Sequence, residues 1–117
     1  SHFKEYNDTK GHEGGDKLLM DIAGIIKAEL RSVDTVTRYG GEEFLVILPD
    51  ISEKGALNAA ERIRSAVQEK TEVTISLGVA SSSEVDNIDD LVGMADKALY
   101  FVKNNGRNAV KGYADIK

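Results

Sequence analysis

The sequence predicts an α+β fold in which three helices pack on a mainly antiparallel sheet. Two observations lead to this prediction. Apolar residues recur every three or four positions in three long segments, as they do on the buried face of a helix. Short runs of β-branched and apolar residues lie between these segments and are typical of strands. The expected helices are 16–30, 53–69 and 88–102, and the expected strands are 35–39, 44–48, 73–79 and 108–113.

The first eleven residues, SHFKEYNDTKG, combine aromatic and polar residues with a glycine, and we expect a strand end followed by a loop. The first helix then starts near Asp16, because a carboxylate in the first turn is favoured by the helix dipole. Its apolar stripe runs from Leu18 to Leu30. Gly106 is the expected stop of the last helix.

Two strands of the predicted sheet are joined by the sequence Gly-Gly-Glu-Glu at positions 40–43. A glycine pair tolerates the positive φ angles that tight turns require, so this segment is expected to form a β-hairpin. The continuous apolar run 44–48 is typical of a central strand, and Pro49 ends it.

Composition limits the class of protein. The 117 residues suit one domain, residues 1–117, and the formal net charge of −5 argues against a nucleic-acid partner. The absence of cysteine excludes a disulfide scaffold and a thiolate zinc site. No apolar run is long enough to span a bilayer and no signal-peptide pattern is present, so the cytoplasm is the expected compartment.

The hairpin turn is the strongest local candidate for a site. Gly40 and Gly41 would let the phosphates of a ligand approach the backbone, and Glu42 and Glu43 follow directly. Mg²⁺ is commonly held by one or two carboxylates together with substrate phosphates, and an acidic protein that binds a nucleotide needs such a cation to screen the charge. The alternative is an ordinary exposed turn.

Asn7 and Asp16 form a second candidate pair. A carboxylate accepts from N–H groups and an amide donates to a carbonyl, and guanine displays both kinds of group on one edge. The alternative is an Asx turn and a helix start.

Lys103 and Arg107 lie four positions apart across a helix end. They would either bind phosphate or complement the negative end of that helix. Arg31, Asp34 and Arg62 by themselves look like surface charges.

Six segments occur together in one order and make the chain recognisable: HFKEYND, GHEGGD, RYGGEEF, VTISLGVA, ADKALY and KNNGRNAV. From residue 1 to about residue 110, they resemble the GGDEF family of diguanylate cyclases. The resemblance implies condensation of two GTP molecules into cyclic di-GMP with release of two pyrophosphates. It also implies a ferredoxin-like, palm-type βαββαβ fold similar to class III nucleotidyl cyclases. Mg²⁺ or Mn²⁺ would be the cofactor, a homodimer the catalytic unit, and a sensor or receiver domain would lie upstream.

The resemblance also implies roles for particular residues. Glu42 would ligate the catalytic metal, and Glu43 would serve as a second ligand or help to activate the 3′-hydroxyl. Asn7 and Asp16 would read the guanine edge. The residues that would hold the phosphates are Phe3, Lys4, Lys103 and Arg107.

A product-inhibition site is implied as well. Arg31 and Asp34 match the RxxD pattern that binds cyclic di-GMP in the family, and Arg62 matches the arginine that completes this site from a neighbouring domain. The alternative function is therefore a catalytically inactive module that binds cyclic di-GMP.

The chain departs from the family pattern at its start. Family members carry a strand ending in Asp-x-Asp just before His-Phe-Lys, and the first Asp is a metal ligand, whereas this sequence has Ser1 where the second usually stands. We therefore expect a sheet that lacks its first strand. Either the sheet borrows a strand from a partner, or the missing strand belongs to a longer sequence. Residues 1–117 by themselves are expected to have little or no cyclase activity.

Overall fold

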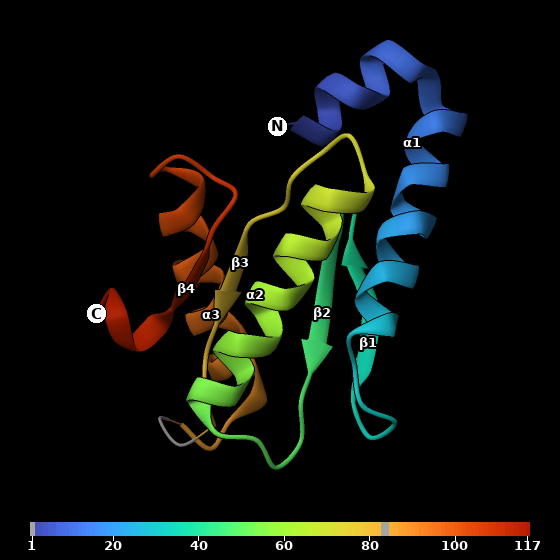
Figure 1. The fold of residues 1–117 in the computed structure, drawn as a ribbon. Helices are drawn as coiled ribbons and strands as arrows, with labels where there is room; N and C mark the ends of the chain where they lie inside the picture. Colours follow the sequence, from blue (N-terminus) through green and yellow to red (C-terminus); the bar gives the residue numbers. More distant parts are fainter. Residues whose placement is uncertain (1, 83–84) are drawn as a thin grey trace.

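The computed structural model describes residues 2–82 and 85–117, with the side chains of residues 2 and 3 excepted. Figure 1 shows how its helices and strands are arranged. In chain order they are α1 (His2–Ala28), β1 (Thr35–Gly40), β2 (Glu43–Ile47), α2 (Glu53–Lys70), β3 (Leu77–Val79), α3 (Ile88–Lys103), β4 (Val110–Gly112) and the short 3-10 helix η1 (Tyr113–Asp115). No helix in this described part combines the length and apolar character that crossing a membrane requires.

The start of the chain differs from the prediction. Helix α1 already begins at His2, and a kink at Gly11 (φ 80°, ψ 172°) divides it into two helical parts. Lys4 and Glu5 are good helix formers, and the Thr9 hydroxyl donates to the Glu5 carbonyl at 2.9 Å within the first part. This segment joins neither strand pair, and local helix propensity prevails.

The predicted hairpin is confirmed. Strands β1 and β2 pair antiparallel, with Val36 opposite Val46 and Arg38 opposite Phe44, and the register is irregular between Arg38 and Gly40. Within the described residues β2 pairs with β1 alone, so it lies at the edge of a two-stranded sheet rather than at the centre of a larger one.

The second pair of strands is parallel, which the sequence did not indicate. β3 pairs with β4 in the register Leu77 to Val110 and Val79 to Gly112. Parallel neighbours need a long crossover connection, and α3 supplies it between these two strands. The sheet is therefore divided into one antiparallel and one parallel pair instead of being mainly antiparallel.

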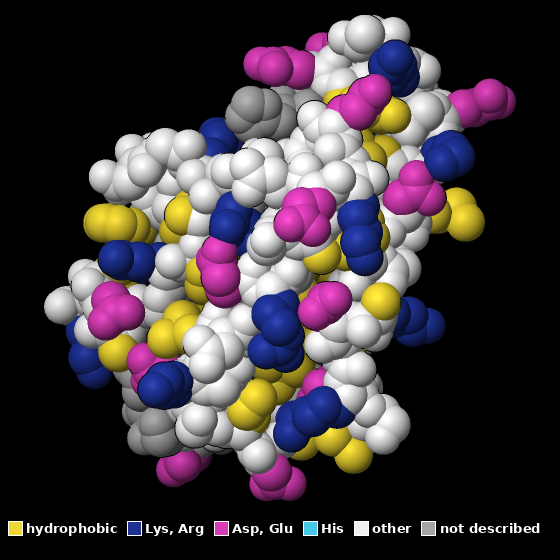
Figure 2. Space-filling view, in the orientation of Figure 1, with side chains coloured by type: hydrophobic (Ala, Val, Ile, Leu, Met, Phe, Trp, Pro, Cys, Tyr) yellow, Lys and Arg dark blue, Asp and Glu magenta, His cyan; other side chains and the backbone are white. Residues whose placement is uncertain are grey.

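The core lies between α1, α2 and the strands. Buried side chains of α1, including Ile22 and Ile26, meet Ile63 and Val67 of α2, and Val67 has no exposed surface. In Figure 1, α2 lies in front of the strands and α3 lies behind β3 and β4. Acidic and basic side chains are interspersed over the face formed by α2, with apolar surface visible between them (Figure 2).

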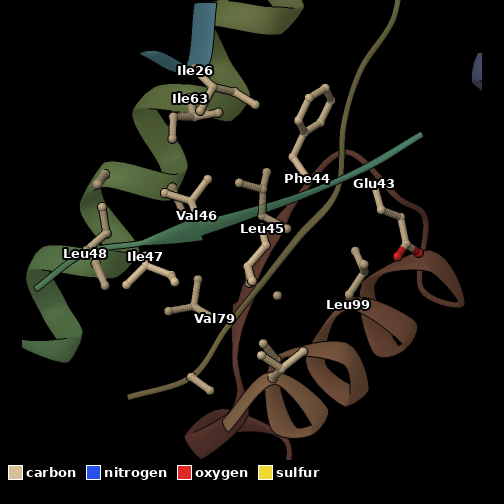
Figure 3. Close-up of a pocket in the computed structure, with 18 of the residues that line it drawn as sticks. Ile26, Glu43, Phe44, Leu45, Val46, Ile47, Leu48, Ile63, Val79 and Leu99 are labelled. Atoms are coloured by element: carbon tan, nitrogen blue, oxygen red, sulfur yellow. The ribbon is translucent and has the colours of Figure 1, made fainter. Parts of the chain in front are cut away.

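A cavity of about 610 Å³ separates the two strand pairs, and we call it the apolar groove. Residues 43–48 of β2 and its exit line one side and residues 73–82 line the other, while side chains from all three helices complete the lining. Figure 3 shows side chains of β2, including Leu45, reaching into this space, with Leu99 of α3 opposite. The groove therefore runs between two strand edges that are not paired with each other.

Gly78 permits the close contact between β3 and α3. A Cβ atom at this position would lie 2.1 Å from the Ala95 carbonyl oxygen and 2.4 Å from the Leu99 backbone nitrogen. These are backbone atoms of a helix, so they cannot move aside independently. We expect Gly78→Ala to reduce the free energy of unfolding by about 3 kcal/mol, because it overpacks a rigid contact.

The matched control is Gly93→Ala in α3, where a Cβ meets nothing within 4 Å. This change should raise the free energy of unfolding slightly, by about 0.5–1 kcal/mol, through helix propensity. Urea denaturation of both variants measures the difference. Equal stabilities of the two variants would contradict the proposed close packing at Gly78.

Candidate functional site

The tip of the β1–β2 hairpin carries the two candidate carboxylates. Gly41 adopts a positive φ of 26°, which allows the chain to reverse. The Arg38 side chain donates from Nε to the Gly41 carbonyl at 2.7 Å and so closes the turn. Arg38 thereby helps to fix the direction in which Glu42 and Glu43 leave the backbone, a role that the sequence pattern did not indicate.

Beside this tip lies a second, smaller cavity of about 330 Å³, which we call the polar pocket. It brings together four of the predicted site residues from two distant segments. Its lining consists of Asn7, His12, Asp16, Leu19, Arg38, Gly41 and Glu42. The hypothesis that Asn7 and Asp16 act beside the hairpin is thus geometrically possible in this fold.

The position of Asn7 depends on two neighbours. Its Nδ2 lies 3.4 Å from Nδ1 of His12. Gly15 is buried, and a Cβ there would come within 2.0 Å of Asn7 Oδ1, so only glycine leaves room for the amide. The kink at Gly11 turns the first part of α1 relative to the second, as Figure 1 shows. The Asx turn proposed as an alternative for Asn7 is wrong, because Asn7 lies within α1.

The apolar groove contains the other half of the candidate site. Glu42 and Glu43 line it at the hairpin end, together with Lys103 and Arg107. Figure 3 shows the Glu43 side chain beside α3, close to Leu99. Glu42 therefore lies where the polar pocket and the apolar groove meet, with the guanine-edge candidates on one side and the phosphate candidates on the other.

Lys103 and Arg107 come from the end of α3. Gly106 has the expected positive φ, 104°, and the Arg107 N–H donates to the Val102 carbonyl at 3.0 Å, as at a helix end with a left-handed C′ residue. The two basic side chains are half-buried.

The remaining two phosphate candidates are at the N-terminus. Lys4 is exposed on α1 and contributes to neither cavity within the described residues. Phe3 lies in α1, but its side chain is outside the described part of the structure.

Arg31 and Asp34 form a bonded pair in the loop between α1 and β1. Arg31 Nη2 and Nε donate to Asp34 Oδ1 at 2.7 and 3.1 Å, and Nη2 also donates to the Pro49 carbonyl at 2.7 Å. The Asp34 side chain is 2% exposed, whereas that of Arg31 is 45% exposed. The Arg31 guanidinium, chiefly through these hydrogen bonds, holds the pKa of the Asp34 carboxyl below its ordinary value.

This pair lies at the opposite end of β1 from the hairpin tip. The strand covers six residues, so the two places are about 17 Å apart along it. Arg62 of α2 is exposed and pairs with Glu29 of its own chain at 3.5 Å. The three residues of the predicted inhibitory site are thus clearly separate from the candidate catalytic residues.

No cluster of three or more histidine, aspartate or glutamate side chains suited to a metal occurs within residues 2–82 and 85–117. The hairpin turn itself supplies two carboxylates, Glu42 and Glu43. Two carboxylates fit a Mg²⁺ ion that a substrate carries on its phosphates better than a site made entirely of protein ligands.

Comparison with known proteins gives these residues a context. The sequence profile described as "Diguanylate cyclase, GGDEF domain" matches residues 1–109. Diguanylate cyclase A of Treponema denticola is 48% identical over 117 residues, covering 92% of this chain and 32% of that protein. The response regulator PleD of Caulobacter vibrioides is 44% identical over 123 residues, covering 96% of this chain and 27% of that protein. The chain thus spans between about a quarter and a third of the length of these curated relatives.

Solved structures share the fold. The GGDEF domain of TpbB (YfiN) from Pseudomonas aeruginosa superposes with a TM-score of 0.87 at 36% identity, covering 97% of this chain and 72% of that one. The GGDEF domain of DgcB from Caulobacter crescentus, solved in complex with c-di-GMP, gives a TM-score of 0.87 at 32% identity, covering 97% of this chain and 73% of that one. The predicted α+β, palm-type fold is confirmed by this likeness.

The Arg31–Asp34 ion pair makes the stability of the fold depend on pH. Because the folded pKa of Asp34 is lowered, its contribution to stability is present above the unfolded value, near 3.8, and is lost as the pH falls through the folded pKa. We expect Asp34→Asn to unfold at lower urea concentration than the wild type at neutral pH. That difference should shrink when the measurement is repeated at a pH below the lowered folded pKa, where protonation removes the same ion pair in the wild type.

Asp21→Asn is the control, because Asp21 pairs with Lys17 in an exposed i,i+4 bridge that contributes little. Its urea midpoint should follow the wild type at both pH values. A difference between Asp34→Asn and the wild type that does not change with pH would show that the ion pair is not its source.

Proposed function

The chain belongs to the GGDEF domain family of diguanylate cyclases, and on that premise we propose that it joins two GTP molecules into cyclic di-GMP and releases two pyrophosphates. The observation that carries the proposal is the position of Glu42 between the polar pocket and the apolar groove. A nucleotide with its base in the polar pocket and its phosphates toward α3 would pass directly across the hairpin tip.

Recognition of the base rests on complementary hydrogen bonding. The Asp16 carboxylate would accept from guanine N–H groups, and the Asn7 amide would donate to an oxygen or nitrogen acceptor on the same base. Gly15 leaves room for the Asn7 amide, and His12 Nδ1 lies 3.4 Å from its nitrogen. Adenine lacks the same set of groups on its edge, so this pair would select guanine nucleotides.

The chemical step transfers a nucleotidyl group. The 3′-oxygen of one GTP attacks the α-phosphorus of the other, the bond to the β-phosphate oxygen breaks, and pyrophosphate leaves; repeating the step in the other direction closes the ring. Lys103 and Arg107 would stabilise the negative charge that gathers on the leaving pyrophosphate. The two nucleotides must face each other, so two copies of the domain would form the catalytic unit.

Mg²⁺ or Mn²⁺ fits the donor set only in part, as a cation shared with the substrate. Glu42 would hold it, with Glu43 as a second ligand or as the group that helps to remove the 3′-hydroxyl proton. When bound, the cation would lower the pKa of the attacking hydroxyl and neutralise phosphate charge.

We also propose that an extended strand occupies the apolar groove in the active domain. The groove is apolar, and β2 and β3 border it with edges that do not pair with each other. The family resemblance places such a strand directly before His-Phe-Lys; it ends in Asp-x-Asp, and the first Asp is a metal ligand. Residues 1–117 alone would therefore have little cyclase activity.

The decisive test is Glu42→Ala in the whole protein, assayed for cyclic di-GMP with GTP and Mg²⁺. We expect turnover to fall by roughly two to three orders of magnitude, because a carboxylate that holds the cation is lost. The thermal midpoint should change little, since Glu42 lies in a turn outside the buried core.

Glu72→Ala, which removes an exposed carboxylate that lines neither cavity, is the matched control and should keep normal turnover. The same assay on residues 1–117 alone tests the strand proposal. If the dimeric wild-type protein makes no cyclic di-GMP, the cyclase proposal is ruled out. If residues 1–117 alone turn over GTP at the wild-type rate, the strand is not needed.

Binding of cyclic di-GMP at Arg31 is a second function, alone or as product inhibition. The observation that favours it is that the Arg31 guanidinium is held by Asp34 and the Pro49 carbonyl while much of its side chain stays exposed. The likeness to DgcB, whose GGDEF domain was solved with c-di-GMP, supports the same proposal. Arg62 would complete the site on a neighbouring copy.

Calorimetry with cyclic di-GMP separates the two functions. Arg31→Ala should weaken binding about 10- to 100-fold, the effect of losing a hydrogen-bonded charge. Lys27→Ala, an exposed change in the last turn of α1, should bind normally. Equal affinity of Arg31→Ala and Lys27→Ala for cyclic di-GMP would contradict the assignment of the inhibitory site. If the wild-type protein binds cyclic di-GMP but makes none, the receptor function is favoured.

A further inference from the structure

Arg64 of α2 makes an unusually connected set of hydrogen bonds for a basic residue outside both cavities. Its side chain is only 17% exposed. Nε donates to both carboxylate oxygens of Glu61 at 2.9 and 3.0 Å, and Nη2 pairs with the same carboxylate. Nη1 donates to Gln68 Oε1 and to Asn108 Oδ1, each at 2.8 Å. The first two partners belong to α2, but Asn108 lies 44 positions further along the chain.

The segment that Arg64 contacts has an unusual backbone conformation. Gly106, Arg107 and Asn108 follow one another with positive φ angles of 104°, 60° and 48°. Residues other than glycine seldom adopt this conformation, and they persist in it only where surrounding contacts hold them.

Three contacts from three different elements hold this turn. The Arg107 N–H donates to the Val102 carbonyl in α3 at 3.0 Å. The Asn108 N–H donates to Ser76 Oγ, just before β3, at 3.1 Å. Arg64 supplies the third contact, from α2 to the Asn108 side chain. It is the charge-assisted member of the set, and such hydrogen bonds are stronger than neutral ones.

Arg64 is poorly placed to bind a nucleotide itself. It lines neither the apolar groove nor the polar pocket. The Glu61 carboxylate raises the pKa of Arg64 and neutralises its charge locally. Its neighbour in this network, Arg107, does line the groove with Lys103 and Glu43. A contact that fixes Asn108 therefore also sets where the adjacent Arg107 side chain begins.

We propose that Arg64, acting through Asn108, is a positioning residue that holds Arg107 in the geometry needed to bind the nucleotide phosphates. This inference rests on the proposed function, because it takes the groove beside Arg107 as the phosphate site. A residue of α2 would thus contribute to phosphate binding without contacting the phosphates, through its one hydrogen bond to the Asn108 side chain. Arg64 would affect substrate binding more than the chemical step.

The test uses steady-state kinetics of the whole protein with GTP. Arg64→Ala removes the donor, and Asn108→Gly removes the acceptor while keeping the positive φ accessible. Each should raise KM about tenfold with kcat within about twofold, the pattern of lost binding rather than lost chemistry. The double variant should be little worse than either single variant, because both break the same contact. Arg64→Lys, which keeps the charge, should recover part of the loss.

Lys70→Ala is the matched control, since it removes a positive charge from an exposed position on the same helix. Hydrogen exchange of the Asn108 amide should be faster in Arg64→Ala than in this control, because the turn is less firmly held. A drop in thermal stability of Arg64→Ala with KM equal to that of Lys70→Ala would overturn the proposal and leave a purely structural role.

Failure of the proposed function can be recognised separately. If the wild-type protein does not turn over GTP, the affinity for inorganic tripolyphosphate with Mg²⁺ replaces KM as the readout. Weaker tripolyphosphate binding by Arg64→Ala than by Lys70→Ala would support the positioning role, and equal binding would overturn it.

Discussion

The packing of α2 against both halves of the molecule is the contact on which the rest of the structure depends. The strand pairs β1–β2 and β3–β4 share no ladder in the described residues, so hydrogen bonds between strands do not join them. Helix α2 contacts α1 as well as β3 and β4, and it contributes Ile63 and Val67 to the buried core. Burial of such side chains is the main force available to hold two small sheets at a set distance, since each pair alone would be marginal in water.

That arrangement decides where the site can be. The hairpin carries its carboxylates on one half, and the end of α3 carries Lys103 and Arg107 on the other, so the apolar groove between the halves becomes the place where these groups face each other. Asn7 and Asp16 reach the same tip because α1 packs along the hairpin side and bends at Gly11. The site is therefore made of short segments from two helices, α1 and α3, and one turn, and its geometry depends on the contacts that hold these elements together. The Arg64–Asn108 contact belongs to this group.

Patterns that act over a few residues were reliable guides. The apolar spacing of the helices, the glycine pair of the hairpin and the stop at Gly106 all appear in the structure where they were expected, because each depends on local backbone preference or on one buried face. The prediction for residues 1–11 was wrong: their aromatic residues suggested a strand end followed by a loop, whereas helix α1 already begins at His2, in line with local helix propensity. Arg38 and Arg64 were missed because an arginine on the surface of an element has no distinctive pattern until its partner is known.

The sequence by itself determined the number and type of most elements, the family to which the chain belongs and the residue types available for binding a guanine nucleotide and a cation. Only the tertiary structure decided that the strands form separate pairs, that one of them is parallel, and that Glu42 lies between the two cavities. The physical reason is range. Helix periodicity and turn chemistry are set by neighbours a few positions away, whereas the pairing of Arg64 with Asn108 and the closeness of Asn7 to the hairpin arise only when segments remote in sequence are packed together.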